Sequence, residues 1–249
     1  DCKIIKWKKS KKIQGSQANA RKFRYKALKK FCKTNKIEHI ILAHHIDDFH
    51  ENFFIRMIRG SGLRGLVSFS DSKSTSNDGI TYLRPFLGYS KKILYKITNT
   101  IFGFNINDPS NQNPKYLRTR VRNIIKNFNR EGFDRKKFNL TINNLISSNK
   151  TINHYVSKNL LDNSKSFIFN NNNTIILKSE FFSQPREVVF RSLSNIILSL
   201  NNNYYPTRGK SLIKQIDLIN NKNFRKTTIG GCIIERVQNS TMIYAEKLK

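Results

Sequence analysis

The chain has 249 residues, a formal net charge of +30 and an apolar content of 38%. This length allows one large or two small domains, and 46 Lys and Arg against 16 Asp and Glu favour a polyanionic partner such as nucleic acid. AT-rich coding enriches Lys, Asn and Ile, but it does not readily give a threefold excess of base over acid. We find no 18-residue apolar run and no signal-peptide pattern, which argues against a membrane protein.

The cysteines disfavour two common kinds of site. Cys2, Cys32 and Cys232 are far apart and form no C-x-x-C pair, so zinc ribbons and redox dithiols are not expected. Such a scattered, odd set suits a reducing compartment, and we expect a cytoplasmic protein. The chain begins at Asp1, and residues 3–7 already have the pattern of a strand. We therefore expect a fragment whose true N-terminus lies upstream.

The first part of the chain predicts alternating strands and helices. A basic loop at 8–17 precedes a helix at 18–36, whose apolar residues recur at helical spacing. The branched, apolar run at 37–43 predicts a buried parallel strand. The next helix is expected to begin near Asp47 or Asp48, with Asp48 and Glu51 as a capping box. Three glycines then break it; these are Gly60, Gly62 and Gly65.

Further along, residues 71–79 predict a polar loop and 82–87 an extended stretch. A helix is expected from the N-cap Ser90 to about 102, where Gly103 stops it. Turn residues at 107–111 precede another helix at 116–128.

Beyond this point the composition becomes rich in Asn. We place a domain boundary at 130–137, which gives domains of 1–132 and 133–249. The second domain is expected to contain helices and hairpins. They are helices at 139–163, 185–200 and 211–219, and hairpins at 167–177 and 230–246.

One run, residues 42–66, gathers most of the side chains that can do chemistry. An apolar strand ends in two His, two Asp and a Glu within eight positions. Ligands of open α/β sheets bind at the carboxyl ends of the strands, so we expect an active site here. The basic loop that follows is rich in glycine, which lets backbone approach a ligand closely.

Residues 44–51, His-His-Ile-Asp-Asp-Phe-His-Glu, and 59–66, Arg-Gly-Ser-Gly-Leu-Arg-Gly-Leu, resemble the signature of the bacterial tRNA(Ile)-lysidine synthases. Three more stretches agree in order. Residues 15–25 resemble the family's Q-A-x-A-R-x-x-R-Y, 83–90 its R-P-L-L segment, and 108–122 its D-P-S-N…R…R element. Phe49 and Asn52 depart from the usual Gln and Thr. The family's pyrophosphate-binding loop, Ser-Gly-Gly-x-Asp-Ser, is expected upstream of Asp1.

The resemblance implies an α/β fold: a PP-loop-type parallel-sheet domain lacking its first strand and P-loop, followed by a smaller α+β domain that grips tRNA. It implies that ATP, with Mg²⁺, adenylates the C2 carbonyl oxygen of the wobble cytidine of a minor tRNA(Ile) with a CAU anticodon. Free L-lysine then displaces AMP and leaves lysidine, which changes codon specificity from AUG to AUA. A homodimer remains open as the assembly.

The resemblance also implies roles for individual residues. It links the lysine step to Asp48, Glu51 and an arginine in the region of Arg118. Asp48 and Glu51 are three residues apart on one helical face, and we expect them to orient the amine. Either Arg118 or Arg122 could hold the lysine carboxylate in a fork. The plainer interpretation of the same pair is a helix cap.

We expect His45 and Asp47 to face the nucleotide or its metal ion, and no separate protein metal site. The remaining assigned residues are basic or lie in the glycine-rich loop. For ATP they are Arg59, Gly60, Ser61 and Gly62, and for tRNA they are Arg21, Arg24, Arg64 and Arg122. A solvated surface is the alternative for each single basic residue.

Two other functions compete with this one. A non-catalytic basic RNA-binding module could keep the fold and the grip on tRNA. A PP-loop thiolase acting on tRNA would normally need paired catalytic cysteines, which this chain lacks.

Overall fold

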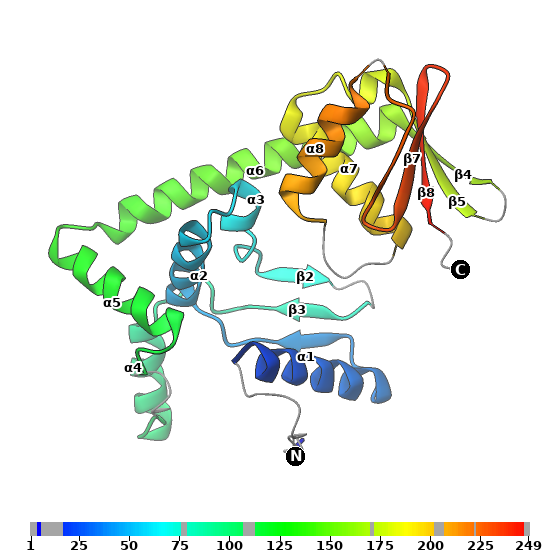
Figure 1. Cartoon of the computed structure of the whole chain (residues 1–249). Coiled ribbons are helices and arrows are strands. Elements are labelled where there is room, and N and C mark those ends of the chain that lie inside the picture. Colours follow the sequence, from blue (N-terminus) through cyan, green and yellow to red (C-terminus); the bar gives the residue numbers. More distant parts are fainter. Residues whose placement is uncertain are drawn as a thin grey trace. The chain divides into compact units, whose positions relative to one another are not determined.

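The computed structural model divides into two compact units, residues 1–142 and 143–249 (Figure 1). It describes residues 4–5, 17–75, 79–106, 113–169, 172–201, 207–221 and 223–246. The strand expected at 3–7 and the turn expected at 107–111 lie largely or wholly outside these residues. No helix in the described ranges is both long and apolar enough to cross a membrane.

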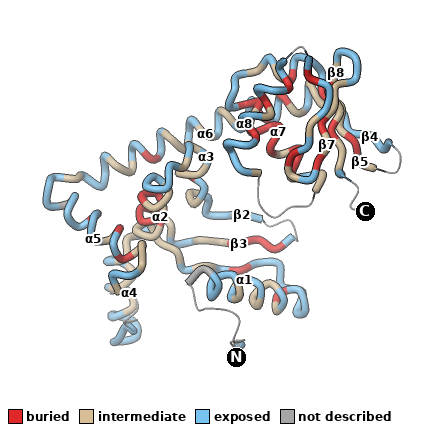
Figure 2. The backbone as a smooth tube through the Cα atoms, viewed as in Figure 1, coloured by how far each residue is buried: buried red, intermediate tan, exposed pale blue. Residues whose placement is uncertain are grey.

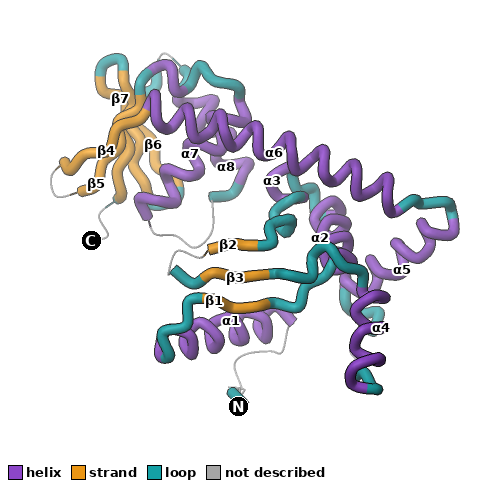
Figure 3. Tube along the Cα trace, turned by 180° about the vertical axis from the view of Figure 1, so that it is seen from behind, coloured by secondary structure: helices purple, strands orange, loops and turns teal. Residues whose placement is uncertain are grey.

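The first unit contains a small mixed sheet in the order β1-β3-β2. β1 (His39–Ile41) pairs in parallel with β3 (Thr81–Leu83), which confirms the parallel strand expected at 37–43. Its expected burial is wrong except at Ile40. β2 (Lys73–Thr75) pairs antiparallel with β3, within a segment that we had expected to be a loop. The three strands run side by side, with α1 (Gln17–Thr34) along β1 (Figure 3).

The first unit has four more helices, two between β1 and β2 and two after β3. They are α2 (Ile46–Ile58), α3 (Leu63–Leu66), α4 (Lys91–Phe102) and α5 (Leu117–Arg130). α4 begins and ends as expected, because the Ser90 hydroxyl accepts a hydrogen bond from the N–H of Ile93 and Gly103 adopts a left-handed conformation.

α6 (Arg135–Asn163) crosses the division between the units. Its first turns belong to the first unit: the Phe138 ring lies 5.3 Å from the rings of Phe53 and Phe54, and Asn139 Oδ1 lies 2.7 Å from His50 Nε2. The division therefore falls later than the expected 130–137. The composition changes at the loop before α6, but packing against α2 keeps the start of α6 in the first unit.

The second unit contains a five-stranded antiparallel sheet in the order β4-β5-β8-β7-β6. Its strands are β4 (Ser164–Phe169), β5 (Asn172–Leu177), β6 (Lys226–Ile229), β7 (Cys232–Val237) and β8 (Ser240–Ala245). Its other helical elements are η2 (Ser179–Phe181), α7 (Arg186–Asn201) and α8 (Gly209–Ile219). Both expected hairpins are confirmed, whereas β6 was not expected. The turn between β6 and β7 needs glycine, because Gly230 and Gly231 have φ of 59° and 74°.

The main core of the second unit forms where α7 and α8 pack on the sheet (Figure 2). Leu193 in the middle of α7 is fully buried there. The other members of this cluster come from both helices and from four strands, among other places. They include Val189, Ile197, Leu212, Leu177, Ile234 and Ile243.

We expect Leu193→Ala to lower the free energy of unfolding of the second unit by about 3 kcal/mol, because it removes buried methyl groups and leaves a cavity. The matched control is Leu161→Ala, which changes a side chain that is 81% exposed and should cost little. Urea denaturation followed by circular dichroism measures both. Equal losses for the two variants would contradict this account of the core.

Candidate functional site at the start of helix α2

α2 begins with a capping box that differs from the expected one. His45 is the N-cap: its Nδ1 accepts a hydrogen bond from the N–H of Asp48 at 3.3 Å, and Asp48 Oδ2 accepts one from the N–H of His45 at 3.1 Å. The expected pair of Asp48 and Glu51 is wrong as a cap, because Asp48 is already the third residue of the helix. Histidine is not among the favoured N-cap residues, so the pattern was missed. Glu51 is thus left for other contacts.

Glu51 receives two arginines from α5. Its side chain is almost buried, and the residue is 4% exposed. Oε1 accepts a hydrogen bond from Arg122 Nε at 2.5 Å, and Oε2 accepts bonds from Arg118 Nε at 2.5 Å and Arg122 Nη2 at 3.3 Å. Arg118 also donates from Nη2 to Asp48 Oδ1 at 2.8 Å. We call Asp48, Glu51, Arg118 and Arg122 the ionic cluster.

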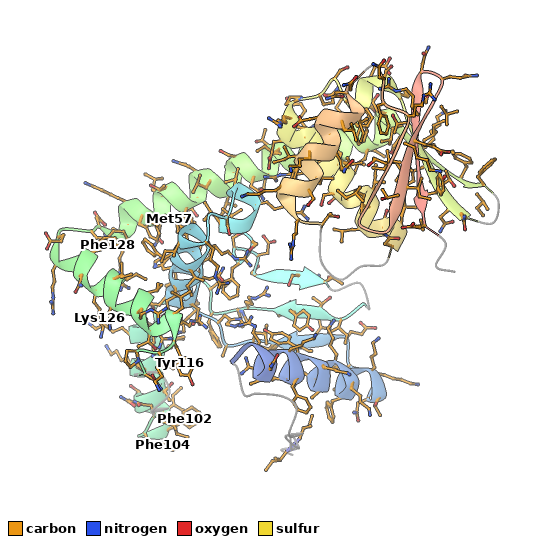
Figure 4. All side chains as sticks on the ribbon, viewed as in Figure 1. Met57, Phe102, Phe104, Tyr116, Lys126 and Phe128 are labelled. Atoms are coloured by element: carbon orange, nitrogen blue, oxygen red, sulfur yellow. The ribbon has the colours of Figure 1, made fainter. Side chains whose placement is uncertain are left out.

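The ionic cluster depends on the packing of α5 against α2. Arg118 and Arg122 lie one turn apart on α5, as Asp48 and Glu51 do on α2, so one face of each helix supplies two charges of one sign. Beneath them Phe54 of α2 packs with Val121 and Ile125 of α5. Figure 4 marks the course of α5 from its N-cap Tyr116 to Lys126 and Phe128.

Arg122 holds its positive charge strongly in this cluster. Burial disfavours the charge of Arg122, but its bond to the Glu51 carboxylate outweighs this and raises the pKa of Arg122 above its usual value. We had expected Arg122 to contact tRNA. In the structure its guanidinium lies on Glu51, where it supports the carboxylate.

Asp47, one residue away, has both of its carboxylate oxygens occupied. Oδ2 accepts a hydrogen bond from the N–H of Lys91 at 2.7 Å, and Oδ1 accepts one from Arg135 Nη1 at 2.8 Å. Asp47 thus joins the start of α2 to the first residues of α4 and α6. The sequence analysis missed Lys91 and Arg135, because they lie 44 and 88 residues away.

We expect Asp47→Asn to lower the free energy of unfolding by about 1–2 kcal/mol near neutral pH. Burial alone would raise the pKa of Asp47, but the Lys91 N–H and the Arg135 guanidinium hold it below its usual value. A depressed carboxyl pKa gives stability that is complete above the unfolded-state pKa, about 3.9, and is lost as the pH falls through the folded-state pKa. The difference between wild type and variant should therefore shrink in acid.

Urea denaturation at a series of pH values measures this difference. Asp162→Asn, which changes an exposed carboxylate of α6, is the control and should have a smaller effect. A difference that grows in acid would contradict the assigned bonds.

The two neighbouring histidines are packing groups. Burial lowers the pKa of His44 to about 4, so its ring is neutral at pH 7, and it lies edge-on to Phe69 with ring centroids 4.8 Å apart. Burial also lowers the pKa of His50, which contacts Asn139.

The glycine-rich loop lies at the other end of α2. Ile58 lies ten residues after Asp48, about 15 Å along the helix axis, so the loop and the ionic cluster are separate places. Gly60 has φ of 70° and open space where a side chain would stand. However, its N–H donates to Met57 O at 2.9 Å and that of Ser61 donates to Arg56 O at 3.0 Å.

These bonds bear on the expected ATP contacts. The N–H groups of Gly60 and Ser61 close the end of α2, so they do not fit a phosphate cradle. The exposed side chains of Arg59 and Arg64, with the backbone at Gly62, remain as possible anion contacts. Arg56 was missed by the sequence analysis; it is partly buried beside this loop, and burial and Arg59 lower its pKa.

Two further groups of residues were assigned from the sequence. Arg21 and Arg24 are exposed on α1, and both guanidiniums lie over the Tyr25 ring, at 5.2 and 6.0 Å from its centroid. In the described ranges, no three His, Cys, Asp or Glu side chains are grouped so that they could hold a metal ion.

Residues 1–128 match the model of the PP-loop domain family, and the chain belongs to this family. It is also similar to several curated proteins, each named tRNA(Ile)-lysidine synthase. That of Wolbachia sp. subsp. Brugia malayi (strain TRS) is 34% identical over 99% of this chain and 56% of its own length. Those of Wolbachia pipientis wMel and Orientia tsutsugamushi (strain Boryong) are 33% and 34% identical, over 98% and 92% of this chain and 56% and 53% of their own. The chain thus spans about half the length of these relatives.

Proposed function

We propose that the chain carries out the ligation of L-lysine to C2 of the wobble cytidine of a tRNA(Ile) with a CAU anticodon, at the expense of ATP. Its similarity to the named synthases extends over nearly the whole chain. The observation that carries the proposal is the ionic cluster. Lysine has ammonium groups and a carboxylate, and this site presents two carboxylates and two guanidiniums, which are the matching partners.

In this proposal adenylation turns the C2 oxygen of cytidine into a leaving group. The lysine amine, as the free base, forms the new C–N bond at C2, the C–O bond to AMP breaks, and the amine gives up a proton. Asp48 and Glu51 orient the amine, and Arg118 holds the lysine carboxylate. Family membership supports the use of ATP. We further propose that Mg²⁺ accompanies ATP and that the reaction takes place in the cytoplasm.

The distribution of charge supports tRNA as the partner. Residues 1–142 carry 31 Lys and Arg against 10 Asp and Glu, and residues 143–249 carry 15 against 6. Both units therefore attract a polyanion, the first more strongly. We propose that the second unit contributes to the grip on tRNA without supplying all of it.

Transfer of labelled lysine to tRNA tests the proposal. The purified chain, with and without the pyrophosphate-binding loop expected upstream of Asp1, is incubated with a tRNA(Ile) transcript, ATP, Mg²⁺ and labelled L-lysine. We expect label in the tRNA only when ATP is present, and none in a matched transcript whose wobble cytidine is replaced by uridine. Label in the uridine transcript would rule out the proposed specificity.

A non-catalytic RNA-binding module is the second candidate. It is favoured by the N–H groups of Gly60 and Ser61, which are already bonded within the chain. Tight tRNA binding with neither lysine transfer nor ATP-dependent formation of AMP would support this candidate against the first.

A further inference from the structure

The two arginines of the ionic cluster make different kinds of contact. Arg122 donates to both oxygens of Glu51, from Nε to Oε1 and from Nη2 to Oε2. Arg118 divides its guanidinium between two carboxylates, with Nε on Glu51 and Nη2 on Asp48. The side chain of Arg118 is also the more exposed, 35% against 26%. Arg118 therefore occupies the position between Asp48 and Glu51 that an incoming ammonium group would need.

We propose that Arg118 is a removable stand-in for the substrate amine, and that this arrangement selects amino acids against simple amines. The inference rests on the proposed function, because it takes the ionic cluster as the lysine site. An ammonium group that enters between Asp48 and Glu51 displaces the guanidinium of Arg118. The displaced guanidinium then pairs with the carboxylate of the same ligand. Arg118 is thus a specificity-determining residue as well as a carboxylate ligand.

The charge balance explains the selection. The cluster contains two carboxylates and two guanidiniums, so its formal charges cancel. L-Lysine brings two ammonium groups and one carboxylate: one ammonium replaces the Arg118 guanidinium between Asp48 and Glu51, and the carboxylate gives the displaced guanidinium a partner. A diamine brings only positive charge and leaves the guanidinium uncompensated in a partly buried site, which is costly. Amines collect around RNA as counterions, so an RNA-modifying site gains from rejecting them.

Arg122, in contrast, stays in place and holds the Glu51 carboxylate. Its two bonds to one carboxylate form a fork, a geometry that fixes Glu51 in place. Glu51 therefore keeps a partner while Arg118 moves. We assign Arg122 as a positioning residue, which acts on the ligand through Glu51.

Isothermal titration calorimetry on the whole chain tests the inference with two probes. L-Lysine carries the carboxylate, and cadaverine is the same diamine skeleton without it. We expect wild type to bind lysine at least tenfold more tightly than cadaverine. In Arg118→Ala the lysine affinity should fall, the cadaverine affinity should rise, and the ratio should drop at least tenfold.

Two more variants complete the experiment. Arg118→Gln keeps most of the side-chain length and should show the same reduced ratio if Arg118→Ala fails to fold. Arg130→Ala removes an exposed arginine from the end of the same helix and should keep the wild-type ratio.

The outcomes separate this inference from the proposed function. If lysine binds and the Arg118 variants keep the wild-type ratio, or if wild type does not discriminate, the stand-in role is refuted and the lysine site survives. If lysine binds to none of the folded chains, the stand-in role and the proposed lysine site fail together.

Discussion

Glu51→Gln is expected to reduce lysine transfer at least about 100-fold, while tRNA binding and part of the adenylation of tRNA remain. Glu51 is buried and accepts three hydrogen bonds from two guanidiniums. The amide of Gln removes the negative charge and turns an N–H₂ donor toward groups that are themselves donors. Two partly buried guanidiniums then lose their negatively charged partner, which costs about 3 kcal/mol and corresponds to about 100-fold in rate.

Single-turnover assays that follow adenylated tRNA and lysidine separately measure this effect. The control is Glu38→Gln, which changes an exposed carboxylate of the same unit and should leave both steps within about twofold of wild type. Full lysidine formation by the Glu51→Gln chain would sink the assignment of Glu51. A loss of tRNA binding as well would point to a collapse of the α2–α5 packing.

The elements that could be predicted are those with local signals. α4 has a serine cap at one end and a glycine at the other, and both work within a few residues of the helix. β1 is a short run of branched apolar residues, which favour a strand by themselves, although only Ile40 is buried. These signals can be recognised in the sequence because they do not depend on a distant partner.

The elements that were missed depend on a neighbour. β2, with the sequence Lys-Ser-Thr, has no apolar alternation and becomes a strand because β3 offers its edge. β6, Lys-Thr-Thr-Ile, likewise forms against β7 across the turn at Gly230 and Gly231. Polar edge strands of this kind are set by their pairing partner rather than by their own sequence.

The residues of the site likewise fall into those that local spacing predicts and those that depend on distant partners. Asp48 and Glu51 could be placed on one face of a helix from their spacing, and the family motif singled out Arg118, which the structure brings against both. Nothing in the spacing placed Arg122 on Glu51 or Arg135 on Asp47, because these bonds close over 71 and 88 residues. The catalytic, ATP-binding and tRNA-binding roles of these residues stay predictions until the assays above are done.

The second large effect is expected in the second unit, at a buried arginine. Arg191 of α7 is 1% exposed. It donates from Nε to Glu187 Oε1 at 2.7 Å and from Nη1 to Asn149 Oδ1 at 2.7 Å and Asn153 Oδ1 at 2.9 Å. Arg191 thus ties the part of α6 that belongs to the second unit to α7.

Arg191→Ala should lower the free energy of unfolding by about 3 kcal/mol, because it opens a cavity and leaves the Asn149 oxygen without its donor. Arg191→Met should cost less. It fills most of the space, and it removes Nη2, which is buried with no hydrogen-bond partner among the described residues. Arg186 lies on the same helix as Arg191 and forms an exposed ion pair with Asp217 of α8. Arg186→Ala should lower the free energy of unfolding by at most about 1 kcal/mol.

Urea denaturation of the three variants gives the order directly. If Arg191→Met is as stable as wild type, the hydrogen bonds of Arg191 contribute nothing beyond its volume, and its burial is a matter of packing alone. If Arg191→Ala and Arg186→Ala lose equal stability, Arg191 does not tie the helices together. We expect Arg191→Ala to be the least stable variant, Arg191→Met the next and Arg186→Ala the most stable. This order requires that both packing and hydrogen bonds hold α6 against α7.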